Sequence, residues 1–269
     1  GLGALAATSP VELMLGVSDW RTIFMILSGL TFAVAVLVFL VVPEKDGPAK
    51  GESLRGQLAG IREVFTSIRF WQAAPLTTMS QASFLSIQGL WSGPWLRDVA
   101  HFNRSEIATV LFMIAVAMIA GFISLGSIAE RLARRGVPVI TTAVCGMTIF
   151  FLVQFLLVVG PLSWAQAVWI VFGFFGTAGI ISYAALSQSF PVHLSGRVTT
   201  GINLLVFVAA FIGQWAIGAI IEIWPIGANG GYSVEGYRAG FGMMLVFQVV
   251  SLGWYFYAGR FIGQDKDTD

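Results

Sequence analysis

Apolar residues run along this chain in eight long stretches that short polar segments separate. Each stretch is about as long as the 17–25 residues that an α-helix needs to cross the hydrocarbon of a bilayer. Away from their ends, the stretches hold one charged side chain, Glu12. We therefore predict an all-α polytopic membrane protein with eight transmembrane helices. The predicted spans are Gly1–Val17, Trp20–Val42, Trp71–Leu96, Glu106–Ile128, Pro138–Val159, Ser163–Gln188, Thr199–Ile221 and Ala239–Phe261.

Composition agrees with this pattern and excludes several kinds of site. Charged residues make up 11% of the chain, against roughly 25% in a soluble domain. A net charge of +1, with basic residues scattered over short loops, excludes a nucleic-acid partner. Cys145 is the only cysteine, so an intrachain disulfide is impossible, and His101 and His193 fall in separate loops. We expect no metal and no cofactor.

Basic residues divide unequally between the two sides that eight spans define. Lys and Arg are enriched in cytoplasmic loops. The side that holds both chain ends carries eleven of them and the opposite side four, namely Arg21, Arg97, Arg104 and Arg238. We therefore expect both ends to face the cytosol, in the inner (plasma) membrane of a bacterium. The eleven are Lys45, Lys50, Arg55, Arg62, Arg69, Arg131, Arg134, Arg135, Arg197, Arg260 and Lys266.

The longest polar segment, 43–70, divides two spans from six. Its first residues are rich in Pro, Gly and charge, which is typical of a linker. From Leu54 to Ile68, apolar residues recur every three or four positions, which predicts an amphipathic helix on the cytoplasmic face. Its arginines, Arg55, Arg62 and Arg69, would lie towards lipid headgroups.

Three short stretches carry a family resemblance. The loop after the fourth span, Gly126-Ser-Ile-Ala-Glu130-Arg131-Leu-Ala-Arg134-Arg135, resembles the pattern G-x-x-x-D-R-x-G-R-R, with Glu130 in place of Asp and Ala133 in place of Gly. Two further stretches resemble helix connections of the same family. One is the turn at 19–24 with the span that follows it and ends at 42–44, and the other is the segment 190–203. That family is the major facilitator superfamily, whose members have twelve spans in two six-helix bundles.

The resemblance implies which part of that fold this chain covers. Residues 1–42 would be the last two helices of an incomplete N-terminal bundle, 43–70 a cytoplasmic linker, 71–261 the six-helix C-terminal bundle and 262–269 a cytoplasmic tail. The missing N-terminal helices of the same protein would then precede Gly1 and pack against this part. A complete eight-span protein of another family is the alternative, because hydropathy alone fits both. The resemblance also implies that the six spans form two inverted three-helix repeats.

In the family's fold, the first helix of each repeat lines a central cavity. In the first of these helices, polar and aromatic residues recur every three or four positions and so share one face, which includes Gln81, Gln88 and Trp91. An amide facing lipid is costly, so this face must look into the bundle. Two interpretations are equally open: the side chains contact solute, or they hydrogen-bond neighbouring helices and hold the bundle together.

Further candidates lie on other spans: two polar residues of the second three-helix repeat and the charged residue of the first span. Tyr183 carries a phenol inside a span and needs a partner, and Asn203 on the next span is a weaker candidate for the substrate-binding set. Glu12 is a proton-coupling candidate because burial raises the pKa of a carboxyl group, although it is near enough to the outer interface to reach water or Arg21.

The Gly126–Arg135 loop is the candidate gating motif. Its members are Gly126, Glu130, Arg131, Arg134 and Arg135. Glu130 can accept hydrogen bonds from Arg131 or Arg134 and so hold the bundle in one of two states. A positive-inside anchor would explain the arginines, but not Glu130 or Gly126.

These features favour a transmembrane transporter of a small solute that works by alternating access, either secondary-active, with proton coupling as one form, or facilitative. A membrane sensor built on a transporter-like bundle, which binds solute without moving it, is the alternative. An enzyme is disfavoured because no catalytic motif is present. No Lys or Arg lies in the middle of a bundle span. Amides and aromatic rings would therefore hold a neutral or amphipathic solute.

Overall fold

The computed structural model describes residues 3, 9–43, 54–160, 162–227 and 230–264. Within these residues all regular secondary structure is helical, and six helices are long and apolar enough to cross a membrane. The all-α membrane fold is therefore confirmed, whereas the count of eight spans stays a prediction. The helices are α2 (Ser9–Leu15), α3 (Trp20–Val41), α4 (Leu54–Thr66), α5 (Ile68–Ser86), η1 (Ile87–Trp91), α6 (Ser92–Asp98), α7 (Arg104–Ala133), α8 (Val139–Val159), η2 (Leu162–Trp164), α9 (Ala165–Gly176), α10 (Gly179–Gln188), α11 (Val192–Ile221) and α12 (Val234–Gln264).

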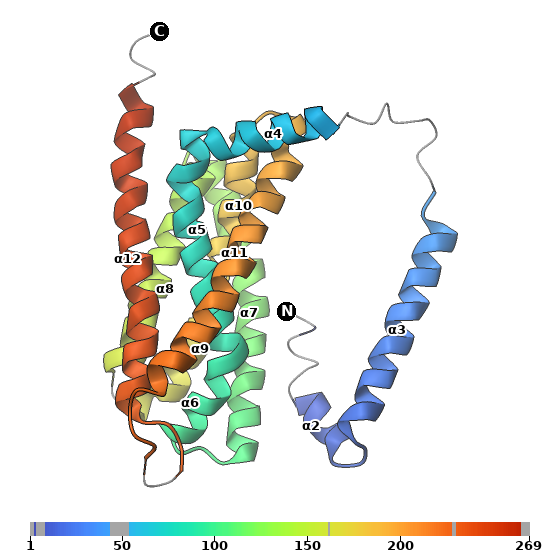
Figure 1. The fold of residues 1–269 in the computed structure, drawn as a ribbon, viewed down its shortest axis with the longest axis vertical. Coiled ribbons are helices and arrows are strands. Elements are labelled where there is room, and N and C mark those ends of the chain that lie inside the picture. Colours follow the sequence, from blue (N-terminus) through green and yellow to red (C-terminus); the bar gives the residue numbers. More distant parts are fainter. Residues whose placement is uncertain (1–2, 4–8, 44–53, 161, 228–229, 265–269) are drawn as a thin grey trace.

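Helices α5 to α12 form one bundle, with α4 lying across one end of it and α6 at the other (Figure 1). We call these the α4 end and the α6 end. The core contains a cluster of aromatic rings, in which Phe84, Phe150, Phe172 and Trp169 pack edge to face or tilted at centroid distances of 4.8–6.0 Å. Inside a bilayer there is no hydrophobic driving force between helices, because lipid tails are as apolar as the side chains. Packing contacts of this kind therefore hold the helices together.

Two of the predicted spans are interrupted. The span predicted at 71–96 begins as α5, passes through the π-helix η1 and ends as α6. A π-turn and the missing N–H of Pro94 both disturb regular α-helical bonding, and the Ser92 hydroxyl donates to the Gln88 carbonyl oxygen at 2.7 Å instead. The span predicted at 163–188 breaks between α9 and α10, at 177–178. The rest of the bundle's helices are continuous within the described residues. Helices α7, α11 and α12 are longer than the apolar stretches that predicted them, and α8 matches its stretch to within one residue.

Helix α4 lies where the amphipathic pattern predicted a helix. Gly60 faces the Arg197 side chain, and Gly201 of α11 contacts the Phe65 ring. The Trp71 indole N–H donates to the Phe65 carbonyl oxygen at 2.7 Å, across the one-residue break between α4 and α5. Helix α4 is therefore attached to both α5 and α11.

The first two helices stand beside the bundle (Figure 1). Asp19 is the N-cap of α3, and its carboxylate accepts a hydrogen bond from the Thr22 N–H at 2.8 Å. Its large apolar side chains are mostly exposed, and Ile23 is buried. Of the predicted first span, α2 covers 9–15, while residues 44–53 of the predicted linker and 265–269 of the predicted tail lie outside the described residues. The predicted domain boundaries stay predictions.

Candidate functional site

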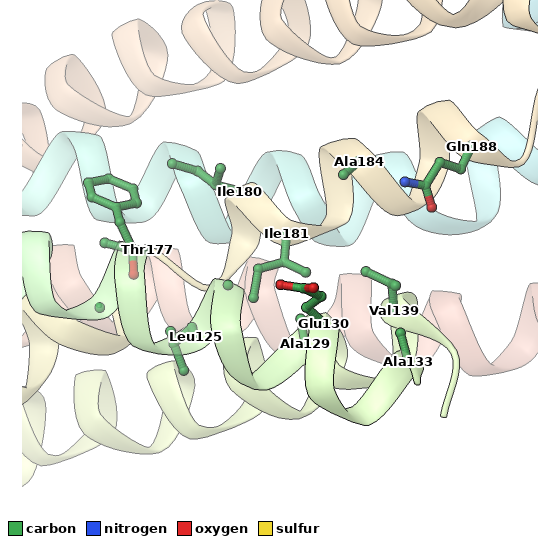
Figure 2. Close-up of a pocket in the computed structure, with 13 residues that line it drawn as sticks. Leu125, Ala129, Glu130, Ala133, Val139, Thr177, Ile180, Ile181, Ala184 and Gln188 are labelled. Carbon is green, nitrogen blue, oxygen red and sulfur yellow. The ribbon is translucent and has the colours of Figure 1, made fainter. Parts of the chain in front are cut away.

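A groove of about 520 Å³ lies between α7 and α10, towards the α4 end of the bundle (Figure 2). Its walls are mainly apolar. The Gln188 amide lies towards one end, and the Glu130 carboxylate lies in the middle, beside Ile181. Thr177, at the break between α9 and α10, lies at the other end. The lining residues are Gly121, Phe122, Leu125, Gly126, Ala129, Glu130, Ala133, Val139, Thr177, Ile180, Ile181, Ala184 and Gln188.

The groove exists because α7 follows α9 closely but makes few contacts with α10. A Cβ atom at Gly173 of α9 would lie 2.8 Å from Ile114 Cγ2 and 2.9 Å from the Ile114 carbonyl oxygen. A Cβ atom at Gly121 of α7 would clash with the Phe174 carbonyl oxygen and lie 2.6 Å from Thr177 Oγ1. Glycine thus allows direct backbone contact up to the helix break. Beyond the break, α7 and α10 separate, and a Cβ at Gly126 would have no atom of the described residues within 4 Å.

The predicted gating motif contributes Gly126 and Glu130 to the lining of this groove. Glu130 accepts a hydrogen bond from Arg134 Nη1 at 2.9 Å, one helical turn further along. Both side chains are about two-thirds exposed, at 70% and 66%, so this pair adds little to stability. Arg131 and Arg135 are exposed, and α7 ends before Gly136, which has a φ of +86°. The motif therefore places an exposed ion pair at the groove and further arginines beside it.

Gln81 lies in the bundle interior. Its side-chain N–H donates to the Gly176 carbonyl oxygen at 3.0 Å, where α9 ends. The side chain is packed so closely that a Cβ at Gly179 would overlap it. Gln81 thus supplies a donor to backbone that the helix break leaves without an intrahelical partner. This contact is of the helix-bridging kind that the sequence left open.

Trp91 and Gln88 have different surroundings, although both belong to the π-helix. The Trp91 indole N–H donates to the Gln214 carbonyl oxygen of α11 at 3.1 Å, and its ring packs against Tyr232 and Tyr237. Gln88 is half-buried, and its amide has no hydrogen bond within the part of the chain that the structure describes. Gln81 and Trp91 therefore bond to different helices, whereas the Gln88 amide bonds to none of the described residues.

Tyr183 and Asn203 are brought together. The Tyr183 hydroxyl donates to Asn203 Oδ1 at 3.4 Å, which joins α10 to α11. Asn203 is exposed and Tyr183 half-buried. The side chain of Glu12 lies outside the described residues, although its backbone belongs to α2. A solute-binding role for Gln81, Gln88, Trp91, Tyr183 and Asn203 stays a prediction, as does a coupling role for Glu12.

A buried amide network in the bundle was not predicted as a unit. Gln154 of α8 is fully buried, and its Oε1 accepts hydrogen bonds from the Ser83 hydroxyl at 2.8 Å and from Gln248 Nε2 at 3.1 Å. Gln154 Nε2 donates to the Phe241 carbonyl oxygen at 3.1 Å. The network links α5, α8 and α12. A lone amide in the middle of the apolar run 139–159 was the available signal, because such a group needs a partner inside the bundle.

Among the described residues, no three His, Cys, Asp or Glu side chains lie close enough together to hold a metal ion. Cys145 is a free, exposed thiol.

The chain is similar to known transporters. Two solved structures of a bacterial homologue of the human lysosomal transporter Spinster, inward-facing and either unoccupied or occupied, match with TM-scores of 0.56 and 0.57 and 18% sequence identity. Each match covers 90% of this chain but only 59% or 58% of the solved chain. No curated protein matched.

The sequence comparison gives the family directly. The profile of the Major Facilitator Superfamily matches residues 1–214, which include the groove, the Gly126–Arg135 motif and most of α11. The solved structures have the same helical arrangement at low sequence identity, and so they support the fold. This chain is an integral membrane protein and belongs to the Major Facilitator Superfamily of transporters.

Proposed function

We propose that the protein moves a small solute across the membrane by alternating access, and that the α7–α10 groove forms part of the solute pathway. The observation that carries this proposal is the change in packing along α7. This helix lies in backbone contact with α9 as far as the break at Thr177. Beyond the break, a groove of about 520 Å³ lies between α7 and α10. A bundle that is closed on one side of a helix break and hollow on the other is suited to open towards one face of a membrane at a time.

The positions of the two broken helices support this proposal. The six-helix bundle reads as two sets of three spans, which begin with α5 and with α9. Each of these first spans is interrupted, by the π-helix η1 and by the 177–178 break. Interrupted helices at corresponding positions of two repeats are a common location of transporter binding sites. Gln81 joins the two spans by bonding to the second break.

The groove favours a neutral or amphipathic solute. Its walls between Gly121 and Ala184 are mostly apolar, so a charged group there would lose hydration without gaining a partner. The Glu130 carboxylate and the Gln188 amide lie further from the helix break at Thr177, towards the α4 end of the bundle. We place the α4 end on the cytoplasmic side of a bacterial inner membrane, because the basic loops favour that side.

Coupling is left open within this proposal. The transporter is either facilitative or secondary-active, and Glu12 is the proton-coupling candidate. The presence of further helices of the same protein before Gly1 stays a prediction.

The proposal is tested by filling the groove. In proteoliposomes that contain the complete protein, counterflow is measured for a panel of labelled neutral and amphipathic solutes. Ala184→Trp places a large ring between α7 and α10 and should abolish counterflow. Val249→Trp, at an exposed position of α12, is the matched control and should retain it. Saturable binding without counterflow in the unmodified protein would overturn transport in favour of a sensor.

A further inference from the structure

At the end of α6, the carboxylate of Asp98 lies at the centre of a hydrogen-bonded cluster. Its side chain is 2% exposed. Arg97 Nε donates to Oδ1 at 2.6 Å and Arg97 Nη2 to Oδ2 at 3.2 Å. The Tyr237 hydroxyl and the Tyr232 backbone N–H donate to Oδ2 at 2.9 and 3.2 Å. A buried carboxylate with four donors is fully satisfied, and removing it would leave those donors without their partner.

The cluster joins segments that are distant in sequence. Tyr232 belongs to the loop between α11 and α12, and Tyr237 is a fully buried residue of α12. The loop approaches Asp98 so closely that a Cβ at Gly231 would lie 2.6 Å from Oδ1. Only glycine permits this approach. The loop is therefore fitted to the carboxylate.

Helix α6 is a short segment between two irregular joints. The π-helix Ile87–Trp91 precedes it, and His101, with a φ of +56°, lies in the turn that follows. Apolar packing also holds this segment: the Trp95 ring packs on Trp169 at a centroid distance of 5.5 Å, and Leu96 is fully buried in the same core cluster. Beside its end lies a recess of about 530 Å³ that Arg97, Asp98 and His101 help to line. The segment thus has a joint on each side and space next to it.

The charge state of the cluster follows from its contacts. Burial opposes ionisation of Asp98, but the hydrogen bonds from Arg97, Tyr237 and Tyr232 outweigh it, and the pKa of the carboxyl group lies below its ordinary value. Asp98 is therefore ionised at neutral pH, and its bonds are charge-assisted.

We propose that Asp98 is a latch that holds α6 against the α11–α12 loop, and that α6 pivots about the π-helix Ile87–Trp91 when the latch opens. The latch lies at the end of the bundle opposite the α7–α10 groove (Figure 1). The latch would therefore act on the α6 end and not on the groove. The proposal holds whichever solute the protein transports.

The test is the accessibility of a buried reporter next to the latch. In a Cys145→Ser background of the complete protein in nanodiscs, Val99→Cys places a thiol at a position that is 2% exposed. The rate of its reaction with a water-soluble maleimide reports opening of α6. Asp98→Asn should raise this rate about tenfold, because it removes the charge from several hydrogen bonds at once.

Two controls make the result decisive. Glu235→Gln neutralises a carboxylate that lines the same recess and has no hydrogen bond to its side chain among the described residues, so it should leave the rate unchanged. A second reporter, Ala73→Cys, is 5% exposed in α5 before the π-helix and should not respond to Asp98→Asn.

The proposal is overturned if the rate at position 99 does not change, or if both reporters accelerate together, which would mean general loosening. Should Asp98→Asn fail to fold, Tyr237→Phe removes one donor and changes the shape little. It should then give a smaller acceleration at position 99 alone, and no acceleration would count against the latch.

Discussion

Helix α7 passes through two different environments. As far as Gly121, the helix lies directly against the backbone of α9. From Gly126 onwards, it faces a groove of about 520 Å³ and lies apart from α10. The same helix is thus a close-packed support on one side of the α9–α10 break and an open wall on the other.

This difference shows that glycine has two separate uses within one helix. At Gly121 the absence of a side chain permits contact that any Cβ would prevent. At Gly126 no neighbour requires glycine in this arrangement. The two positions are five residues apart, so sequence alone does not separate them, but substitution does.

The largest expected effect comes from closing the contact at Gly121. Gly121→Leu should lower the free energy of unfolding by about 1–3 kcal/mol or more, because the added atoms meet the Phe174 backbone, which cannot move aside as a side chain could. Thermal unfolding in detergent measures this loss. Gly126→Leu is the matched control, and its stability should stay within about 0.5 kcal/mol of the unmodified protein. Equal losses in both variants would remove the distinction between the closely packed part of α7 and the part that faces the groove.

A somewhat smaller effect is expected at the break itself. Gln81→Leu removes the donor to the Gly176 carbonyl oxygen and leaves a buried acceptor unsatisfied, which costs about 1–3 kcal/mol. Gln88→Leu, whose amide has no hydrogen bond within the described residues, should have little effect on stability. The midpoints of thermal unfolding of the two variants test this difference. A stable Gln81→Leu protein with weakened solute binding would favour the solute-contacting interpretation instead.

The membrane-spanning segments could be predicted from the sequence because lipid imposes long apolar runs. Their ends could not. Helix α12 begins at Val234, five residues before the predicted Ala239, because Glu235 and Arg238 are exposed residues that continue the helix beyond the apolar run. The interruptions were also hidden. Glycines occur at the α9–α10 break, but also at Gly213 in the unbroken α11, so a glycine does not by itself reveal a break.

The candidate site was predictable where its residues are adjacent in sequence. The Gly126–Arg135 motif contains both members of the Glu130–Arg134 pair, because one helical turn separates them. The groove itself depends on α10, about fifty residues further along, and the bond from Gln81 depends on where α9 ends. Helical spacing gives the face on which a residue lies, but not its partner across the bundle.

Removing the charge at the groove should have a small effect on stability and a separate effect on function. Glu130→Gln breaks an exposed pair of the i, i+4 type, which contributes less than about 0.5 kcal/mol. We expect an unchanged thermal midpoint but a changed rate of counterflow, because the pair lies at the groove. Glu106→Gln is a control at the other end of α7, where the carboxylate accepts a hydrogen bond from the Asn103 N–H at 2.8 Å. A loss of stability as large as that of Gly121→Leu would mean that the part of α7 from Gly126 onwards is not the loosely held one.

The smallest effect is expected at the α6 end and appears only in acid. The folded pKa of Asp98 is lower than its ordinary value of 3.8, so the latch contributes stability that is fully present above that value. The contribution is lost as the pH falls below 3.8 through the lowered folded pKa, because the folded state then has to take up a proton that the unfolded state already holds. Among the described residues, the other ionisable groups around this carboxylate are Arg97, His101, Tyr232, Glu235 and Tyr237. Thermal unfolding between pH 5 and 8 should therefore show the same pH dependence with and without Asp98→Asn. Below pH 3.8 only the protein with Asp98 should lose the latch contribution. If the thermal midpoints of the two proteins depended differently on pH near neutrality, Asp98 would not be ionised there. Apolar contacts alone would then hold the α6 end together.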